Sequence, residues 1–343
     1  MPYDTLSVEF ARGCIFQCKF CNFPVLGVKT DHTRDADDYR DELWENYDKW
    51  GVTSYTVSDE TINDYTGKLK KFGDVTRELP FKPWLGGFVR GDVATARQQD
   101  WDHMIDMGLL AHWYGIESFN HPSAKYVGKG MNPDRIKEGL VEIRDYFKSN
   151  AGNYRATASF IYGLPHETKE TLEKQEKWLL ENWQNQDAIV YTLQIRDEGL
   201  SDFDAVSTIS RDFDKLGYTR YSYEEAVAQI LKRKHNDPYY KQMYDAMVED
   251  QQTFTDQIYW KNNETELDYF ECNEMRKQFM VKYDEVRSPG TYHIHHWLQA
   301  GYSLDDVEKK TREISGNGNP SDLPPFHFHV KYIEEYKQKK LGL

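Results

Sequence analysis

Short β-type runs alternate with longer helical patterns through the first two hundred residues of this chain, and this rhythm leaves few possible folds. The runs with the length and the β-branched and aromatic content of strands are Leu6–Phe10, Ser54–Val57, Trp84–Val89, Leu109–Ile116, Arg155–Ile161 and Ile189–Ile195. Helical spacing between them predicts helices over Asp37–Trp50, Tyr65–Leu79, Ala96–Met107, Asn132–Ser149 and Thr168–Trp183. Strand–helix repeats of this length favour an α/β fold with a parallel sheet. Such a sheet is either a partial (β/α)6 barrel or an open doubly wound sheet.

The pattern changes after Arg196. Residues 197–220 are polar and irregular, and helical spacing then returns. The helices expected there are Tyr223–Lys234, Tyr239–Gln251, Glu264–Tyr283, a short one near Leu304–Ile314, and Tyr332–Lys340. We therefore expect a core barrel over residues 1–200 and a mainly helical region over residues 201–343. Because a barrel of six strands leaves an open side, the second region is expected to cover the mouth of the barrel.

Charge and hydropathy exclude several classes of protein. The chain has 343 residues, with 43 Lys and Arg against 57 Asp and Glu, for a net charge of −14. This acidic balance argues against broad binding to a nucleic-acid backbone. No run approaches the ~20 apolar residues that cross a bilayer, and the first residues, MPYDTLSVEF, do not resemble a signal peptide. A cytoplasmic protein without a membrane partner is expected.

Three of the four cysteines lie within the segment RGCIFQCKFC, directly after the first expected strand. The loop can present Cys14, Cys18 and Cys21 to three irons of a cubane cluster, which leaves the fourth iron open. An open coordination position is typical of a metal that takes part in chemistry. A zinc site completed by His32 and a chance group of structural thiols remain alternatives. Cys272 is expected to be a small buried side chain.

The spacing Cys-x3-Cys-x2-Cys resembles that of the radical S-adenosylmethionine (SAM) superfamily. In that family the open iron of a [4Fe-4S] cluster chelates the amino and carboxylate groups of SAM. The resemblance implies that Cys14, Cys18 and Cys21 are the cluster ligands and that the cofactors are a [4Fe-4S] cluster and SAM. It also implies that Phe20 packs near the adenine.

Two downstream strand ends carry further residues that match the family. After the second strand, Asp59 and Glu60 stand where the family binds the amino group of SAM, although an ordinary polar loop is an alternative. The fourth strand ends in GIES, which is similar to a turn of the cobalamin-binding and coproporphyrinogen dehydrogenase-like groups. The resemblance implies that Glu117 accepts hydrogen bonds from the ribose. Lys129 either neutralises the SAM carboxylate or is a solvated surface lysine.

The fifth strand leads into the segment SFIYGLPHET, which resembles a segment of the same two groups. The resemblance places Ser159 near the ribose, Ile161 beside the adenine, and Gly163 where the backbone approaches the nucleoside. It extends over roughly residues 4–200 and favours the partial barrel over the open sheet. Because the cysteine loop begins at residue 14, no cobalamin domain is expected on this chain.

These similarities imply a radical SAM enzyme. It would cleave SAM reductively to a 5′-deoxyadenosyl radical, which abstracts hydrogen from an unidentified small-molecule or peptide substrate. The expected partner is an external one-electron reductant resembling flavodoxin or ferredoxin. The alternatives are a radical SAM methyltransferase whose further cofactor is supplied in trans, and a non-catalytic iron–sulfur scaffold protein. The sequence identifies no residue that acts catalytically on the substrate.

Overall fold

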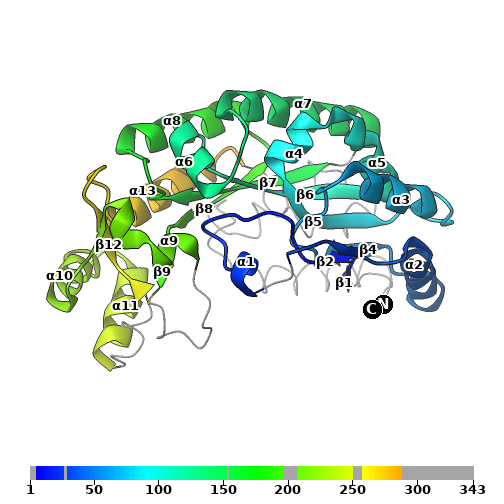
Figure 1. The fold of residues 1–343 in the computed structure, drawn as a ribbon. Helices are drawn as coiled ribbons and strands as arrows, with labels where there is room; N and C mark the ends of the chain where they lie inside the picture. The colour runs from blue at the N-terminus through cyan, green and yellow to red at the C-terminus, as the bar shows by residue number, and fades with distance from the viewer. Residues whose placement is uncertain (1–4, 27–28, 153, 197–206, 250–256, 288–343) are drawn as a thin grey trace, which may run out of the picture.

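The computed structural model describes residues 5–26, 29–152, 154–196, 207–249 and 257–287 (Figure 1). Its centre is a six-stranded sheet in the order β1-β4-β5-β6-β7-β8, and every neighbouring pair is parallel. The strands are β1 Thr5–Val8, β4 Ser54–Val57, β5 Trp84–Arg90, β6 Leu109–Glu117, β7 Arg155–Tyr162 and β8 Asp187–Thr192. The predicted α/β class with six parallel strands is confirmed.

Seven helices between these strands lie on one side of the sheet, whereas the short α1 Phe23–Leu26 belongs to the loop after β1 (Figure 1). They are α2 Ala36–Trp50, α3 Thr66–Thr76, α4 Gly91–Ala96, α5 Trp101–Met107, α6 His121–Val127, α7 Pro133–Ala151 and α8 Lys169–Asn182. Because strand order follows chain order and parallel crossovers are right-handed, successive helices fall on the same face. A doubly wound sheet would reverse its strand order part-way. The sheet is therefore a partial barrel, as the sequence predicts, with its other face turned inward.

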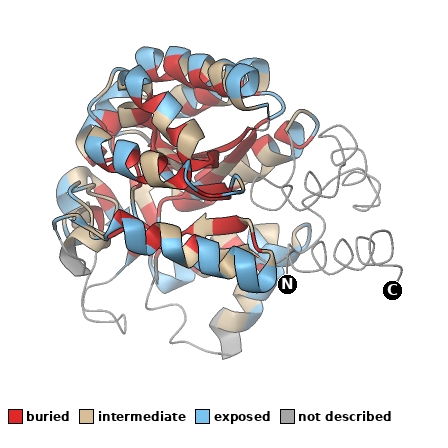
Figure 2. Ribbon diagram, turned by 90° about the vertical axis from the view of Figure 1, so that its right-hand side faces the viewer, coloured by how far each residue is buried: buried red, intermediate tan, exposed pale blue. Residues whose placement is uncertain are grey.

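Residues alternate along each strand between the helical layer and the inside of the barrel. In β6, the side chains of His112 and Tyr114 are fully buried under the helices, and the His112 ring contacts Phe147 of α7. Trp113 and Gly115, between and beside them in sequence, line an internal cavity instead. The strands and the inner faces of the helices are accordingly the buried part of the molecule in Figure 2. The inside of the barrel is left to carry the functional site.

Several predicted elements have different bounds, and three of the differences are instructive. Of the helix expected over Ala96–Met107, only α5 is α-helical; α4 ends at Ala96, and a bend at Arg97 (φ −120°, ψ 69°) and a short 3₁₀ turn separate the two helices. The last strand ends at Thr192, not Ile195, because β9 Ile195–Arg196 leaves the sheet to pair with β11 Gln257–Ile258. The helix expected from Glu264 begins at Tyr269 (α13 Tyr269–Tyr283), where the Asp268 carboxylate accepts from the Glu271 N–H.

The described residues after 206 are mainly helical, as expected. It contains α9 Thr208–Arg211, β10 Tyr218–Arg220, α10 Tyr223–Arg233, α11 Pro238–Glu249, β12 Trp260–Asn262 and α13. The helix α13 contacts β7, β8 and α8, so this region extends the core beyond the last strand. The helices predicted near Leu304–Ile314 and Tyr332–Lys340 lie outside the described residues. Within the described ranges, no helix has the length and apolar character needed to cross a membrane.

Candidate active site

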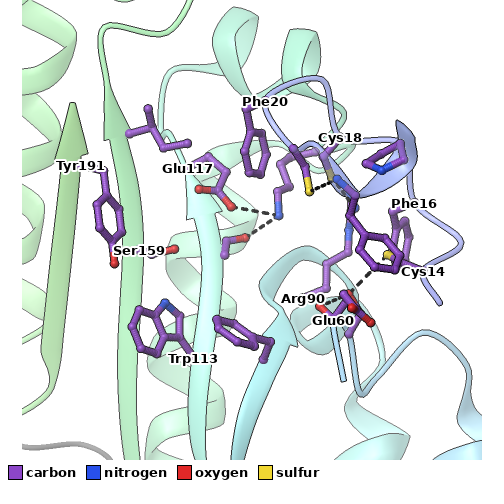
Figure 3. A pocket seen from close by; sticks show the side chains of 18 of the residues that line it. Cys14, Phe16, Cys18, Phe20, Glu60, Arg90, Trp113, Glu117, Ser159 and Tyr191 are labelled. Carbon is purple, nitrogen blue, oxygen red and sulfur yellow. Dashed lines mark hydrogen bonds and ion pairs between the residues drawn. The ribbon is translucent and has the colours of Figure 1, made fainter. Parts of the chain in front are cut away.

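A cavity of about 590 Å³ lies inside the barrel at the carboxyl ends of its strands (Figure 3). Its size is that of a small-molecule site. Nine of the residues singled out from the sequence line it: Cys14, Cys18, Phe20, Cys21, Glu60, Glu117, Lys129, Ser159 and Ile161. Lys129 comes from the turn after α6, and the others come from the loop after β1 and from the ends of β4, β6 and β7. The barrel thus brings together most of the predicted site.

The loop that carries the three cysteines is held at both of its ends. Its flanks pair as two short strands, β2 Ala11–Arg12 and β3 His32–Thr33. In its middle, the Lys19 N–H donates to the Val127 carbonyl at 3.2 Å, which fixes the loop to the end of α6. Burial raises the pKa of the Cys21 thiol, and the neighbouring Cys18 and Cys14 raise it further. All three cysteines line the cavity.

The geometry argues against a zinc site. Among the described residues, no three His, Cys, Asp or Glu side chains are placed to hold a single metal ion. His32 does not line the cavity, and its ring Nε2 is 2.9 Å from the Thr30 hydroxyl. The three thiolates of a cubane cluster bind three different irons, so they lie farther apart than the ligands of a single zinc ion. Three thiols on one cavity wall meet that requirement.

Arg90 joins the cysteine loop to the barrel, and the sequence analysis missed it. Its Nη1 donates to Cys18 Sγ at 3.4 Å, its Nη2 to the Gly128 carbonyl at 2.5 Å, and its Nε to Asp92 at 2.7 Å. The guanidinium also lies 3.8 Å from the centre of the Phe16 ring. Its position at the end of the third strand, where a parallel barrel places functional groups, was the signal that could have identified it.

Glu117 and Lys129 form a buried ion pair at the end of β6. The Lys129 Nζ lies 3.4 Å from Glu117 Oε1 and donates to the Gly115 carbonyl at 2.8 Å. Burial raises the pKa of Glu117, and the charge of Lys129 opposes this. Lys129 is only 5% exposed, so the alternative of a solvated surface lysine is wrong. A Cβ on Gly115 would lie 2.7 Å from Glu117 Oε1, so the glycine leaves room for the pair.

Asp59 and Glu60 are adjacent in sequence, but only Glu60 lines the cavity. Glu60 lines the cavity together with Thr61, whose hydroxyl is 3.8 Å from Cys14 Sγ. Asp59 is not among the lining residues; its carboxylate accepts from the Phe10 N–H at 2.8 Å and links the ends of β1 and β4. Burial raises the pKa of Asp59 to about 7. The structure therefore places Asp59 in the wall that supports the cavity.

Gly163 also lies away from the cavity. It has φ +91°, and a Cβ there would be 2.2 Å from the Trp260 ring and 3.3 Å from Cys272 Sγ. The absence of a side chain thus admits the Trp260 ring. Cys272 is fully buried in this packing, as predicted.

A second glutamate, Glu167, shapes the turn that follows β7. Its carboxylate accepts from the backbone N–H groups of Gly163 and Leu164 at 2.9 and 3.1 Å and from the Ser118 hydroxyl at 2.5 Å. Because it is fully buried, the pKa of Glu167 rises to about 8. Thr168 then begins α8 through a capping box with Thr171, as expected for an N-cap. Sequence reasoning assigned no role to Glu167.

Comparison with known families decides the identity of this site. The family model described as the radical SAM superfamily matches residues 8–179, which are half of the chain. The chain belongs to the radical SAM superfamily. The matched residues include the cysteine loop and the ends of β4, β5, β6 and β7 that line the cavity, whereas β8 lies beyond the match.

The relatives of this radical SAM protein are mostly longer. An uncharacterized methyltransferase of Synechocystis sp. is 29% identical over 171 residues, which are 48% of this chain and 30% of that protein. One from Pyrococcus horikoshii is 23% identical over 172 residues, which are 50% of this chain and 36% of that protein. The methyltransferase TsrM from Kitasatospora setae, solved with cobalamin and a [4Fe-4S] cluster, has a TM-score of 0.50 at 12% identity, covering 64% of this chain and 42% of its own. The chain thus spans about a third of the curated relatives.

Membership implies that this enzyme uses a [4Fe-4S] cluster and SAM, a substrate, and a source of electrons. The donor set of the cavity fits both cofactors. Three thiols would bind three irons, and the buried Lys129 and Glu117 offer one positive and one negative partner for the polar groups of SAM. Ile161 and Phe20 supply apolar surface for a base.

Proposed function

We propose that this radical SAM enzyme cleaves SAM reductively and uses the product radical on a substrate held inside the barrel. The observation that carries the proposal is that the three thiols and the Glu117–Lys129 pair line one cavity. When bound, the reduced cluster would supply one electron to the sulfonium of SAM, which yields methionine and a 5′-deoxyadenosyl radical that takes a hydrogen atom from the substrate. The proposed partners are a small-molecule or peptide substrate and a flavodoxin- or ferredoxin-like reductant.

The chain's contribution at the cluster is to hold the thiolates. Cys14, Cys18 and Cys21 are the proposed ligands, and Arg90 donates a hydrogen bond to Cys18. A hydrogen bond from a guanidinium favours the thiolate over the thiol, because it stabilises the negative charge. Since the same guanidinium is fixed by Asp92 and by the Gly128 carbonyl, it also holds the loop at a fixed distance from β5.

The chain's contribution to SAM is to orient the nucleoside and the amino-acid part. Lys129 is the proposed partner of the carboxylate, Glu60 of the amino group, and Glu117 of the ribose hydroxyls, with Ser159 nearby. Phe20 and Ile161 would enclose the adenine. Because Glu117 and Lys129 are 5% exposed, their hydrogen bonds to a ligand would form away from bulk water, where they are stronger.

We further propose that residues 201–343 cover the barrel mouth and take part in substrate selection. Support comes from the way this region fixes the last strands. The Trp260 indole N–H donates to the Leu193 carbonyl at 2.9 Å, and the Tyr218 hydroxyl donates to the Gly163 carbonyl at 2.7 Å. Leu193 lines the cavity, so the hydrogen bond from Trp260 connects the C-terminal region to the edge of the cavity.

A second candidate function is methyl transfer with cobalamin supplied in trans. Two relatives are named methyltransferases, and TsrM was solved with cobalamin. A methyl group carried from SAM to the substrate would distinguish this function from hydrogen abstraction alone. The relatives' names are the observation that favours it.

The test uses protein reconstituted anaerobically with iron and sulfide. With dithionite and SAM we expect methionine and 5′-deoxyadenosine, slowly even without substrate, and none from Cys18→Ala. Methyl-labelled SAM with added cobalamin tests the second function. If cluster-loaded protein binds SAM but yields no 5′-deoxyadenosine under strong reduction, the enzyme proposal fails and the scaffold alternative replaces it.

A further inference from the structure

The cavity continues from the cysteine loop into the barrel, and this inner part is aromatic. Its lining includes Phe88 of β5, Trp113 of β6 and Tyr191 of β8. Phe88 and Tyr191 are 46% and 48% exposed, whereas their sequence neighbours Val89 and Val190 are 1% and 2% exposed. Strands of a parallel sheet are usually covered on both faces. These rings therefore present uncovered aromatic surface toward the inside of the barrel.

The three rings are arranged around one space. Phe88 and Trp113 are direct partners in the register of β5 and β6, and their ring centres lie 5.3 Å apart with the planes tilted by 41°. Figure 3 shows Tyr191, Ser159 and Trp113 on neighbouring strands along the cavity wall. A flat group between Tyr191 and the Phe88–Trp113 pair would contact ring faces or edges on both sides, which is the favoured geometry for aromatic pairs.

The polar groups at this inner part are uncharged. They are Ser159 and Gln194. The Gln194 side-chain amide donates to the Thr192 carbonyl at 3.2 Å. Its side-chain oxygen is an acceptor that a ligand can use.

The charged groups that line the cavity lie toward the cysteine loop, and three of these four residues form ion pairs. Lys129 is 3.4 Å from Glu117, and the guanidinium of Arg90 is 2.7 Å from Asp92. A charged ring system in the inner part would be buried without a counter-ion, which is costly. A cation would also meet the positive sulfonium of SAM in the same cavity. An uncharged ring avoids both penalties.

We propose that the substrate carries an uncharged aromatic ring system, held between Tyr191 and the Phe88–Trp113 pair. These side chains then determine which substrate is accepted. The inference rests on the proposed function, because it takes the radical to be formed at the outer end of the same cavity.

The test measures binding without turnover. Cluster-loaded protein with SAM but no reductant is dialysed to equilibrium against indole, cyclohexylmethanol or N-methylquinolinium. Indole is flat and neutral, the second compound lacks a ring face, and the third is an aromatic cation. We expect indole to bind at least about tenfold more tightly than either of the others. Equal binding of indole and cyclohexylmethanol, or tighter binding of the cation, overturns the proposal.

Matched variants locate the binding. Phe88→Leu and Tyr191→Leu keep apolar bulk but remove the ring, and each should weaken indole binding about threefold to tenfold. Tyr191→Phe keeps the ring and should stay within about twofold. Trp44→Leu on α2 is the control, because Trp44 is equally exposed at 48% but does not line the cavity. Unchanged binding in both leucine variants at the cavity overturns the proposal.

The outcomes separate this inference from the proposed function. If the protein cleaves SAM under dithionite but does not prefer indole, only the inference fails. If indole binding is lost in Tyr191→Leu and kept in Trp44→Leu while SAM is not cleaved, the aromatic site is supported and only the proposed function fails.

Discussion

Glu117 and Glu167 are both buried, and both belong to turns that resemble motifs of the radical SAM superfamily, but they do different work. Glu117 lines the cavity, and it forms an ion pair with Lys129 at 3.4 Å. Glu167 accepts from two backbone N–H groups and a hydroxyl of its own surroundings. The hydrogen-bonding capacity of Glu167 is used by its turn, whereas Glu117 keeps capacity for a ligand.

The same division separates two glycines and two cysteines. Gly115 and Cys18 line the cavity with Glu117, and we call these three the cavity-side residues. Gly163 and Cys272 pack with Trp260 behind the Glu167 turn, and we call Gly163, Glu167 and Cys272 the turn-side residues. Similarity to a motif therefore identifies a region of the fold, and the contacts within that region decide which of its residues bind a ligand. Cavity-side changes should alter ligand binding, and turn-side changes should alter stability.

The largest contrast is expected between the two cysteines. Cys18→Ala should abolish cluster binding, from about four irons per chain to almost none, because a ligand and the acceptor for Arg90 are removed together. Cys272→Ala should keep the iron and lower the free energy of unfolding by about 1–2 kcal/mol, as expected for a small buried side chain. Iron and sulfide assays with chemical denaturation check both values. Equal loss of iron in the two variants would show that the division is wrong.

The two glycines give the next contrast. Gly163→Ala places a Cβ 2.2 Å from the Trp260 ring at φ +91°, so we expect it to destabilise the fold by about 3 kcal/mol. Gly115→Ala brings a Cβ to 2.7 Å from Glu117 Oε1 and 3.2 Å from Lys129 Nζ. These are ends of flexible side chains, so stability should change little while SAM binding weakens. Denaturation curves and equilibrium dialysis of SAM provide the two readouts, and a stable Gly163→Ala protein would contradict the contrast.

The parts of the fold that the sequence predicts are those with local signals. The bounds of β4 are as predicted, and those of β6 and β7 differ by one residue, because a run of β-branched and aromatic residues marks a buried parallel strand. The helix over Ala96–Met107 is predicted wrongly because the break at Arg97 has no glycine or proline to announce it. The cavity positions of Cys14, Cys18, Cys21 and Glu117 follow from their places just after strands.

The parts that the sequence does not predict depend on contacts between distant segments. Position 163 requires a glycine because Trp260, nearly a hundred residues later in the chain, packs against it, and no local sequence pattern connects the two residues. Asp59 and Glu60 are adjacent, and only the fold shows which faces the cavity. Phe88 and Tyr191 have the pattern of ordinary core residues, because the inside of the barrel is distinguished from the helical face only when the sheet has curved.

Glu117 itself tests the cavity side. Glu117→Ala should weaken SAM binding about tenfold to a hundredfold, because a buried hydrogen bond to a charged group contributes roughly 1.5–3 kcal/mol. Iron content should be unchanged, since no cysteine is touched. Dialysis of SAM against cluster-loaded protein measures the affinity, and Glu167→Gln is the matched control. If the Glu167 variant weakens SAM binding as strongly as the Glu117 variant, the two glutamates are not divided as we infer.

Glu167 tests the turn side through pH, with the smallest expected effect. Burial raises the pKa of Glu167 from 4.5 to about 8. Between these two pH values the folded chain keeps the Glu167 proton that the unfolded chain releases. The stabilisation of the fold by protonated Glu167 is therefore complete below about pH 4.5 and is lost as the pH rises through 8. Glutamine cannot ionise, so Glu167→Gln removes this dependence. From pH 6 to pH 8 the free energy of unfolding should fall by about 2 kcal/mol more in the wild type than in the variant.

Chemical denaturation at these two pH values measures the difference, and other buried groups cancel in it. Burial raises the pKa of Asp59 to about 7 and lowers that of His112 to about 4, but both are the same in the wild type and in Glu167→Gln. The SAM affinity of the variant should not depend on this proton, because Glu167 does not line the cavity. Parallel pH curves for the two proteins would mean that Glu167 is ionised within the turn. The hydrogen bonds from its three donors would then stabilise the carboxylate more than burial destabilises it.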